Sequence, residues 1–363
     1  MSRLRLLLVA DAVGGVWTYS LELARALEPL GVDAVLAIAG PSANAEQRQA
    51  AAGIQLIDTG LPLEWLDTSG ASIERAGEAL AQIAKDQCAD VVQTSSAALL
   101  AGGMFACPSV AVQHSCVAPW WAAVKGTPLP RHFEWRRELV DRGLRRADIV
   151  VAPTRAFADA TQRAYSFDRP VLTVHNGRTA REVRPLPQGD FVFTAGRLWD
   201  EGKNIATLDR AAKRIDVPFQ GAGPTHGPNG ASVAPQHLIT LGELSEARIA
   251  GLLAARPIYA SAALYEPFGL SVLEAAQAGC ALVLSDIATH RELWDGAAVF
   301  VDPSHDSAFA AAIDQLLIDR EHRNALGKRA RERSRHYAPD RMARAMAEIY
   351  ARVTQPQLIA GAA

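Results

Sequence analysis

Two glutamates flank a bend in the segment YEPFGLSVLE, residues 265–274. Pro267 prevents a helix from beginning earlier, and Gly269 gives the bend its conformational freedom. A helix is predicted directly after the bend, so Glu266 precedes the bend and Glu274 lies in the second helical turn. A predicted strand runs into this bend, and both carboxylates are therefore expected at one end of a sheet.

The predicted helix start lies between the two carboxylates. The amides near Gly269, Leu270 and Ser271 have no partners within the helix and can bind an anion. Carboxylates accept hydrogen bonds from pairs of hydroxyls. The order carboxylate, anion site, carboxylate matches the hexose, diphosphate and ribose of a nucleotide-sugar. The alternative is that Glu266 caps the helix and Glu274 lies on its exposed face.

Two cations follow another predicted strand, in the segment TAGRLWDEGKN. Arg197 and Lys203 are separated by a loop that contains glycine. An arginine fork binds two phosphate oxygens, and a lysine adds a compact positive charge. The pair predicts a diphosphate site, and two solvated loop charges are the alternative.

Two further candidate sites lie at strand ends in the first half of the chain. Gly14 and Gly15 occupy a predicted strand-to-helix turn, where a ligand can approach the backbone closely. A phosphate contact is one interpretation of these glycines, and a tight turn is the other. His114 follows a later strand. It is interpreted either as facing a cleft or as making a structural hydrogen bond.

Short apolar runs alternate with amphipathic segments along the whole chain, which predicts an α/β protein with parallel sheets. Seven such runs precede a polar, arginine-rich linker at residues 176–190, and six follow it. The predicted domains are residues 1–180 and residues 181–338, with a C-terminal helix at residues 339–363 that packs back on the first domain. Both domains are expected to be doubly wound and Rossmann-like. Because ligands of such sheets bind beyond the carboxyl ends of the strands, we expect the site in a cleft where the two domains face each other.

The composition argues against several classes of partner. The formal net charge is −2 over 363 residues, so the chain lacks the basic surplus typical of nucleic-acid binding. No apolar run reaches the roughly 18 residues of a membrane span, and the N-terminal run is too short for a secretion signal. The four cysteines have no metal-ligand spacing and are expected to be buried, reduced thiols, which favours a cytoplasmic protein. They are Cys88, Cys107, Cys116 and Cys280.

Several segments resemble the retaining glycosyltransferases of the GT-B fold, in family 4. The E-x7-E element EPFGLSVLE is the most specific of these segments. AGRLWDEGKNIATL resembles that family's phosphate-binding loop, and DAVGGVWTYSLELARAL resembles its N-terminal glycine loop. ADIVVAPTRAFADA and TVHNGR resemble the end of its N-terminal domain. These segments occur in the family's order along nearly the whole chain.

The resemblance implies four catalytic residues. Glu266 and His114 are expected beside the donor sugar, and Arg197 and Lys203 at the leaving diphosphate. Cations in that position stabilise the negative charge that develops as the sugar leaves. Ala262 and Ala263 depart from the pattern, because Pro-Ser often precedes the YE pair in this family.

The other candidates are implied to bind the donor. Glu274 is expected to accept hydrogen bonds from the ribose hydroxyls. The turn and the glycine loop are expected to contact the phosphates or to shape their site: Gly14, Gly15, Phe268, Gly269, Leu270 and Ser271. No Asp-x-Asp metal clamp is present, so no metal ion and no cofactor are predicted. A UDP-sugar donor is favoured over a GDP- or ADP-sugar donor.

No motif indicates the acceptor or the oligomeric state. Trp120 and Trp121 precede a stretch of arginines that is interpreted either as an aromatic, basic patch for an acceptor or membrane surface, or as a solvated helix face. The second interpretation is favoured because nearby acids nearly offset the cations. These residues are Arg131, Arg136, Arg137, Arg142, Arg145 and Arg146, with Glu134, Glu138 and Asp141.

Three other functions stay open at the level of the sequence. A nucleotide-sugar epimerase of the same fold would bind the same donor without transferring the sugar. A nicotinamide-dependent dehydrogenase would also use two doubly wound domains, but the chain lacks G-x-G-x-x-G. A non-catalytic nucleotide-sugar-binding protein would not need the full set of charged residues.

Overall fold

The computed structural model describes residues 3–184 and 186–355. This part of the chain divides into two compact units. Unit 1 contains residues 3–177 and 339–355, and unit 2 contains residues 178–338. The division lies close to the boundary predicted between residues 180 and 181.

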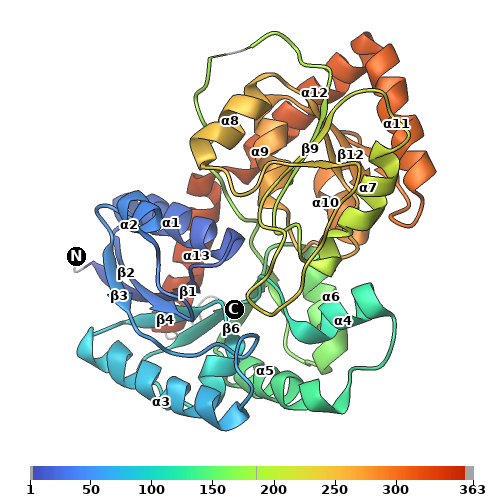
Figure 1. Ribbon diagram of the computed structural model, residues 1–363. Helices are drawn as coiled ribbons and strands as arrows, with labels where there is room; N and C mark the ends of the chain where they lie inside the picture. The colour runs from blue at the N-terminus through green and yellow to red at the C-terminus, as the bar shows by residue number, and fades with distance from the viewer. Residues whose placement is uncertain (1–2, 185, 356–363) are drawn as a thin grey trace. The chain divides into compact units, whose positions relative to one another are not determined.

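A fully parallel sheet forms the centre of unit 1 (Figure 1). Its strands lie in the order β3-β2-β1-β4-β5-β6-β7, so the order reverses between β1 and β4. The bounds are β1 (Leu4–Asp11), β2 (Val32–Ala39), β3 (Gln55–Asp58), β4 (Val91–Thr94), β5 (Ser109–Val112), β6 (Ile149–Ala152) and β7 (Leu172–Thr173).

Helices connect these strands, as parallel pairing requires. The α-helices of unit 1 are α1 (Gly15–Leu27), α2 (Ala45–Ala50), α3 (Gly70–Asp86), α4 (Val117–Lys125), α5 (Glu134–Arg146), α6 (Arg155–Tyr165) and α13 (Pro339–Thr354). Short 3-10 turns are η1 (Glu28–Leu30), η2 (Ala97–Ala101) and η3 (Arg131–Phe133).

The C-terminal helix α13 belongs to the core of unit 1. Met346 and Tyr350 on α13 are fully buried in one cluster with Leu23 of α1 and residues of the sheet. Figure 1 shows α13, in red, beside α1, in blue. The Tyr350 hydroxyl donates to Gln93 Oε1, and Gln93 Nε2 donates to the Tyr19 hydroxyl over 3.2 Å. These side chains join the last helix to α1 and β4 in the interior.

Unit 2 repeats the same plan with a six-stranded parallel sheet. The order is β10-β9-β8-β11-β12-β13, which reverses between β8 and β11. The strands are β8 (Val192–Ala195), β9 (Phe219–Ala222), β10 (Ile239–Thr240), β11 (Ile258–Ser261), β12 (Ala281–Ser285) and β13 (Val299–Val301). Its helices are α7 (Ile205–Ala212), α8 (Glu246–Ala254), α9 (Leu270–Ala278), α10 (Ala288–Trp294), α11 (Asp306–Ile318) and α12 (Arg320–Ser334), with 3-10 turns η4 (Glu201–Lys203) and η5 (Arg335–Tyr337).

Both faces of this second sheet are buried. Val283 belongs to a cluster with α7 and α11, whereas its neighbours Leu282 and Leu284 belong to a cluster with α9. Successive side chains of a strand point to opposite faces, so an unbroken apolar run is required where helices cover both. This explains why the strands appear in the sequence as continuous apolar runs.

The predicted α/β class is confirmed, and each predicted run contains a strand in the described part of the chain. The predicted linker at residues 176–190 has neither helix nor strand among its described residues. One prediction is wrong: Cys88 is exposed, because the chain turns there through a left-handed conformation (φ 49°) after α3. Cys116 and Cys280 are buried as predicted, and Cys107 is half-buried. No helix in residues 3–184 and 186–355 is long and apolar enough to cross a membrane.

Candidate active site

A pocket lies at the point in unit 2 where the strand order reverses. The carboxyl ends of β8 and β11 form its floor, and it is lined by Thr194, Ala195, Gly196, Leu198, Lys203, Ile205, Ser261, Glu266 and Ser271. Open parallel sheets bind their ligands at such reversal points. Three of the predicted site residues, Lys203, Glu266 and Ser271, are therefore brought together.

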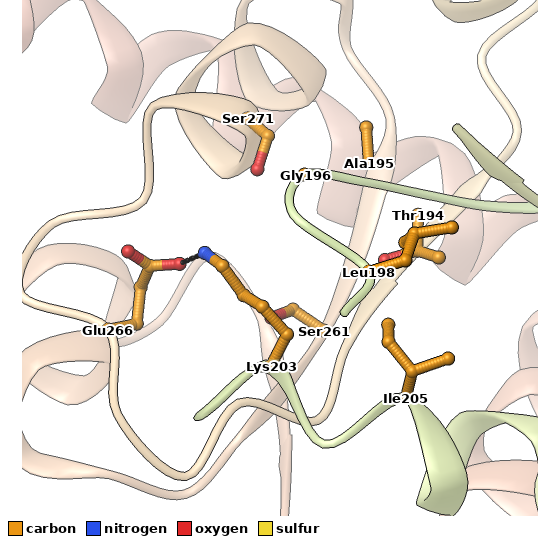
Figure 2. A pocket seen from close by; sticks show the side chains of 9 residues that line it. All are labelled: Thr194, Ala195, Gly196, Leu198, Lys203, Ile205, Ser261, Glu266 and Ser271. Carbon is orange, nitrogen blue, oxygen red and sulfur yellow. Dashed lines mark hydrogen bonds and ion pairs between the residues drawn. The ribbon is translucent and has the colours of Figure 1, made fainter. Parts of the chain in front are cut away.

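Lys203 and Glu266 form an ion pair across this pocket. Figure 2 shows the Lys203 ammonium directed at the Glu266 carboxylate, with the Ser271 side chain pointing into the same space. The two charged side chains are only 19% and 11% exposed. A charged side chain that is mostly removed from water needs an opposite charge beside it. The Lys203 ammonium and the Glu266 carboxylate provide this for each other.

The loop that carries Lys203 is fastened to the loop after β11. Asn204 adopts a left-handed conformation (φ 53°), and its Nδ2 donates to the carbonyls of Ala262 and Pro303 over 3.0 and 2.8 Å. The Gly202 carbonyl accepts from the Leu264 amide over 2.9 Å. These bonds hold the residues on either side of Lys203, so its side chain projects toward Glu266 from a fixed backbone.

Two residues that sequence reasoning missed support the Glu266 loop from beneath. Ser285 donates its hydroxyl to the Ala263 carbonyl over 2.6 Å, and the His290 ring contacts Ser285 over 3.1 Å. His290 is fully buried, and burial lowers its pKa, so the neutral form is favoured. Ala262 and Ala263 are also fully buried. Their small side chains let this loop pack on the sheet where the resembling family often has Pro-Ser.

The start of α9 faces the same pocket as predicted from the bend. Gly269 adopts a left-handed conformation (φ 86°) as the N-cap, and α9 begins at Leu270. A Cβ on Gly269 would lie 3.2 Å from Val272 Cγ2 and 3.3 Å from Glu266 Cγ. Glycine is needed both for the backbone conformation and for the close approach of Glu266. The first amides of α9 therefore point outward beside Glu266.

Phe268 has a structural position. It is buried, and its ring meets the Tyr337 ring edge-to-face at 5.6 Å. On the sheet below, the buried Tyr259 hydroxyl donates to the Ala195 carbonyl over 3.3 Å, and burial raises its pKa. These aromatic side chains fix the turn against the core and the strand end.

The structure does not bring Arg197 into the pocket. Its guanidinium pairs with Asp200 over 2.9 Å, and its Cζ lies 5.5 Å from the centre of the Trp199 ring. The acid three residues downstream, visible in the sequence RLWD, is the signal that sequence reasoning passed over. A role for Arg197 at a diphosphate would require it to leave Asp200, and that role stays a prediction.

Glu274 is also paired. It lies in the second turn of α9, where its Oε1 accepts from Arg178 Nε over 2.8 Å. Arg178 is a buried residue that sequence reasoning did not single out, although it stands within the segment TVHNGR. The carboxylate is 26% exposed, so part of it is accessible to a ligand.

The remaining candidates belong to unit 1. Gly14 has positive φ (80°) as the N-cap of α1, and Gly15 is the first residue of that helix. Asp11, at the end of β1, accepts from the Val13 amide over 2.7 Å. A glycine-capped helix start thus follows β1, beside the reversal of strand order in this sheet. The predicted phosphate contact of these glycines stays a prediction.

His114 lies just beyond β5 and is half-buried. Its ring packs against Tyr19 with the ring centres 4.2 Å apart. Its Nε2 is shielded from solvent and has no hydrogen-bond partner in the described part of the chain. Burial lowers the pKa of His114 to about 4, so the imidazole is neutral at physiological pH.

The lowered pKa of His114 predicts a pH dependence of stability. An unfolded histidine has a pKa of about 6.5, so the unfolded chain takes up a proton first as the pH falls. The free energy of unfolding should therefore fall between about pH 6.5 and 4, with at most about 1.4 kcal/mol per pH unit coming from this group. Urea unfolding of the wild type and His114→Gln across this range should give a difference that changes below pH 6.5 and is constant above pH 7. A difference in the free energy of unfolding that is independent of pH would contradict the lowered pKa of His114. His290 does not contribute to this difference, because both proteins contain it.

The arginines of α5 form hydrogen bonds and ion pairs within unit 1. Arg136 donates to the carbonyls of Glu64 and Asp67, both over 2.7 Å, and Arg146 donates to the Ala101 carbonyl over 2.5 Å. Arg142 pairs with Glu74 over 2.6 Å. These three arginines therefore bind other elements of unit 1 and not the acids of their own helix. Arg137 and Arg145 pair with Glu134 and Asp141 on α5, as predicted for a charged helix face. Trp120 and Trp121 lie on α4 with their ring centres 6.2 Å apart.

No group of three histidine, cysteine, aspartate or glutamate side chains could hold a metal ion in residues 3–184 and 186–355.

Comparison with protein families gives two matches. A model described as Glycosyltransferase Family 4 matches residues 13–180, and one described as Glycosyl transferases group 1 matches residues 233–333. Together the two ranges cover most of the chain. No curated protein sequence shows significant similarity to it.

Solved structures with the same fold cover nearly all of the chain. The sucrose-phosphate synthase from Thermosynechococcus elongatus is 19% identical, with a TM-score of 0.78 over 99% of this chain and 100% of that protein. HepE from Anabaena, in complex with UDP-glucose, is 17% identical, with a TM-score of 0.74 over 96% and 100% of the two chains. A glycosyltransferase from Rickettsia africae is 16% identical, with a TM-score of 0.71 over 97% and 99%.

The chain belongs to the GT-B glycosyltransferases. The predicted glycosyltransferase family and the GT-B fold are thereby confirmed, and retention stays a prediction.

The family matches do not reach every part of the site in this glycosyltransferase. Glu266, Ser271 and Glu274 lie within the second matched range, and Gly14 and His114 within the first. Residues 181–232, which include the cationic loop, fall between the two ranges. The assignment of that loop rests on the geometry of the pocket and on the resemblance of AGRLWDEGKNIATL to the family's phosphate-binding loop.

Proposed function

We propose that this glycosyltransferase moves a sugar from a nucleoside-diphosphate sugar to an acceptor hydroxyl, with retention of anomeric configuration and without a divalent cation. The observation that carries the proposal is the pocket where Lys203, Glu266 and the start of α9 converge. A UDP-sugar is the favoured donor. The acceptor is defined only as a hydroxyl-bearing molecule.

The charges of the pocket suit a departing diphosphate. When the bond between the anomeric carbon and the phosphate oxygen breaks, negative charge grows on the diphosphate. The Lys203 ammonium and the amides of α9, whose first turn carries about half a positive charge, lie together at this pocket. They would stabilise the transition state more than the ground state. Positive charge there does what a divalent cation does in other enzymes, and this is the basis for proposing metal independence.

The ion pair between Lys203 and Glu266 suggests how the donor enters. A diphosphate would compete for Lys203 and release the Glu266 carboxylate, which can then accept hydrogen bonds from sugar hydroxyls. Both side chains are mostly buried, so each needs a new partner at the moment the pair separates. A ligand that carries both an anion and hydroxyls supplies both partners at once.

Retention is proposed from the resemblance to the retaining family. The acceptor oxygen would form its bond to the anomeric carbon on the face from which the diphosphate leaves. Its proton would pass to a diphosphate oxygen, so no separate base is required. The roles of His114 and the glycine loop of unit 1 near the donor are part of this proposal.

The neighbouring structures favour a uridine nucleotide. HepE from Anabaena has been solved with UDP-glucose and also with UDP and glucose. At 17% identity this likeness shows the shared fold, and the choice of base for this chain is a proposal.

A panel of nucleotides tests the donor class. Thermal melting of the protein with UDP-, GDP- and ADP-sugars, and with NAD, should show a rise in Tm for the UDP-sugars, because a ligand that binds only the native state stabilises it. A rise with NAD alone would contradict the proposal. A rise with a GDP- or ADP-sugar would keep the donor class and correct the base.

The stereochemistry and the metal requirement need separate measurements. With the donor identified, the NMR coupling constant of the anomeric proton in the product should show the α configuration from an α-linked donor, and a β product would refute retention. Turnover should persist after treatment with a chelator, and a loss that added Mg²⁺ or Mn²⁺ restores would refute metal independence.

A further inference from the structure

Arg178 is a buried cation at the first residue of unit 2. Its side chain is only 8% exposed. Its amide donates to the Tyr337 carbonyl over 3.1 Å, and its carbonyl accepts from Gln277 Nε2 over 2.7 Å. Both backbone groups are thus tied to unit 2, so the guanidinium projects from a fixed point next to α9.

The guanidinium contacts carboxylates on two helices. Its Nε donates to Glu274 Oε1 on α9 over 2.8 Å, and its Nη2 lies 3.0 Å from Glu246 Oε1 on α8. The planar fork of arginine can hold two partners in fixed directions, which a lysine cannot do. Glu246 also forms an ion pair with the exposed Arg181. Of these two arginines, Arg178 is the one that contacts Glu274.

This contact determines how Glu274 can meet a ligand. Arg178 occupies Oε1, and Oε2 has no hydrogen-bond partner in the described part of the chain. The carboxylate therefore has one oxygen held and one oxygen available. The Arg178 charge also offsets that of Glu274, which lies one helical turn from the amides proposed to bind the diphosphate. An uncompensated carboxylate there would repel a diphosphate.

We propose that Arg178 is a positioning residue for nucleotide binding, which holds Glu274 so that its carboxylate accepts hydrogen bonds from the ribose hydroxyls. The inference rests on the proposed function, in which Glu274 binds the ribose. A residue that acts through this contact affects the preference for ribose over a sugar without hydroxyls. A residue with only a structural role weakens the binding of both equally.

The test compares UDP with 2′,3′-dideoxy-UDP by isothermal titration calorimetry. The wild type should bind UDP roughly tenfold or more tightly than the dideoxy analogue, because hydrogen bonds to a charged group are lost with the hydroxyls. In Arg178→Met this ratio should fall to about threefold or less. In Glu274→Ala the ratio should be near one, and adding Arg178→Met to Glu274→Ala should leave it unchanged, because Arg178 then has nothing to act through.

Arg181→Met is the matched control. It removes an arginine that pairs with the same Glu246 but does not touch Glu274, so the wild-type ratio should persist. Arg178→Lys is the second variant, and it decides the question if Arg178→Met does not fold. A lysine keeps the charge but cannot hold both carboxylates, so an intermediate ratio is expected.

The outcomes separate this inference from the proposed function. A wild type that discriminates between the two nucleotides, together with a folded Arg178→Met or Arg178→Lys that discriminates equally well, overturns the inference alone. A wild type that binds none of UDP, GDP and ADP overturns the proposed function and this inference with it. If GDP or ADP is the nucleotide bound, the same ratio is measured with its dideoxy analogue.

Discussion

Replacing Lys203 by alanine is expected to lower kcat by roughly a hundredfold or more, which corresponds to about 3 kcal/mol of transition-state stabilisation. Lys203 is the cation that projects into the pocket beside the start of α9. Because its interaction with the diphosphate strengthens as the sugar leaves, the loss should appear mainly in kcat and less in KM. Steady-state kinetics with the donor that the nucleotide panel identifies would measure both constants.

Two controls accompany this variant. Lys213→Ala removes an exposed lysine of the same unit and should keep wild-type kinetics. Lys203→Ala also leaves the mostly buried Glu266 carboxylate without its ion-pair partner, which can destabilise the protein. Thermal melting must therefore show that the variant is folded. A folded Lys203→Ala with near-normal kcat would remove the basis for placing the diphosphate in this pocket.

The second large effect is expected for Gly269→Ala. The residue has φ of 86°, and a Cβ would lie 3.3 Å from Glu266 Cγ, so both the helix start and Glu266 must shift. A non-glycine residue in the left-handed region costs about 1–2 kcal/mol of stability. A displacement of the reacting groups by about 1 Å costs on the order of a hundredfold in kcat/KM, so the shift of a few tenths of an ångström that these contacts require is expected to lower kcat/KM severalfold. Urea unfolding and steady-state kinetics would measure the two effects.

Gly230 offers a matched control for this substitution. Its φ of 82° is nearly the same, but a Cβ there meets nothing within 4 Å. Gly230→Ala should therefore lose a similar amount of stability from backbone strain and keep its activity. If both variants lost activity to the same extent, the loss would reflect general destabilisation, and the proposed role of the α9 start would be wrong.

The secondary structure could be predicted because each signal is local. The apolar runs mark strands buried on both faces, and Gly279 ends α9 with left-handed φ (84°), as glycine commonly does at the end of a helix. Even β7 and β10, two-residue strands at sheet edges, lie within predicted runs. The exposure of Cys88 was missed because an apolar neighbourhood in sequence does not reveal a left-handed turn.

The pairing of the charged residues could not be predicted in the same way. Lys203 meets Glu266 because the adjacent strands β8 and β11 bring the loops that follow them together. Arg178 meets Glu274 because its backbone is bonded to Tyr337 and Gln277, which are distant in sequence. The register and crossovers that create these contacts are properties of the whole sheet, and no short segment contains them. The pair of Arg197 and Asp200 is the opposite case, since an acid three residues away is a local signal.

The most direct test of the central claim is a crystal structure of the protein with UDP bound. The account predicts phosphate oxygens about 3 Å from Lys203 Nζ and from the amides of Leu270 and Ser271, with the Glu266 carboxylate released from Lys203. A nucleotide bound elsewhere, with Lys203 and Glu266 still paired across an empty pocket, would contradict it.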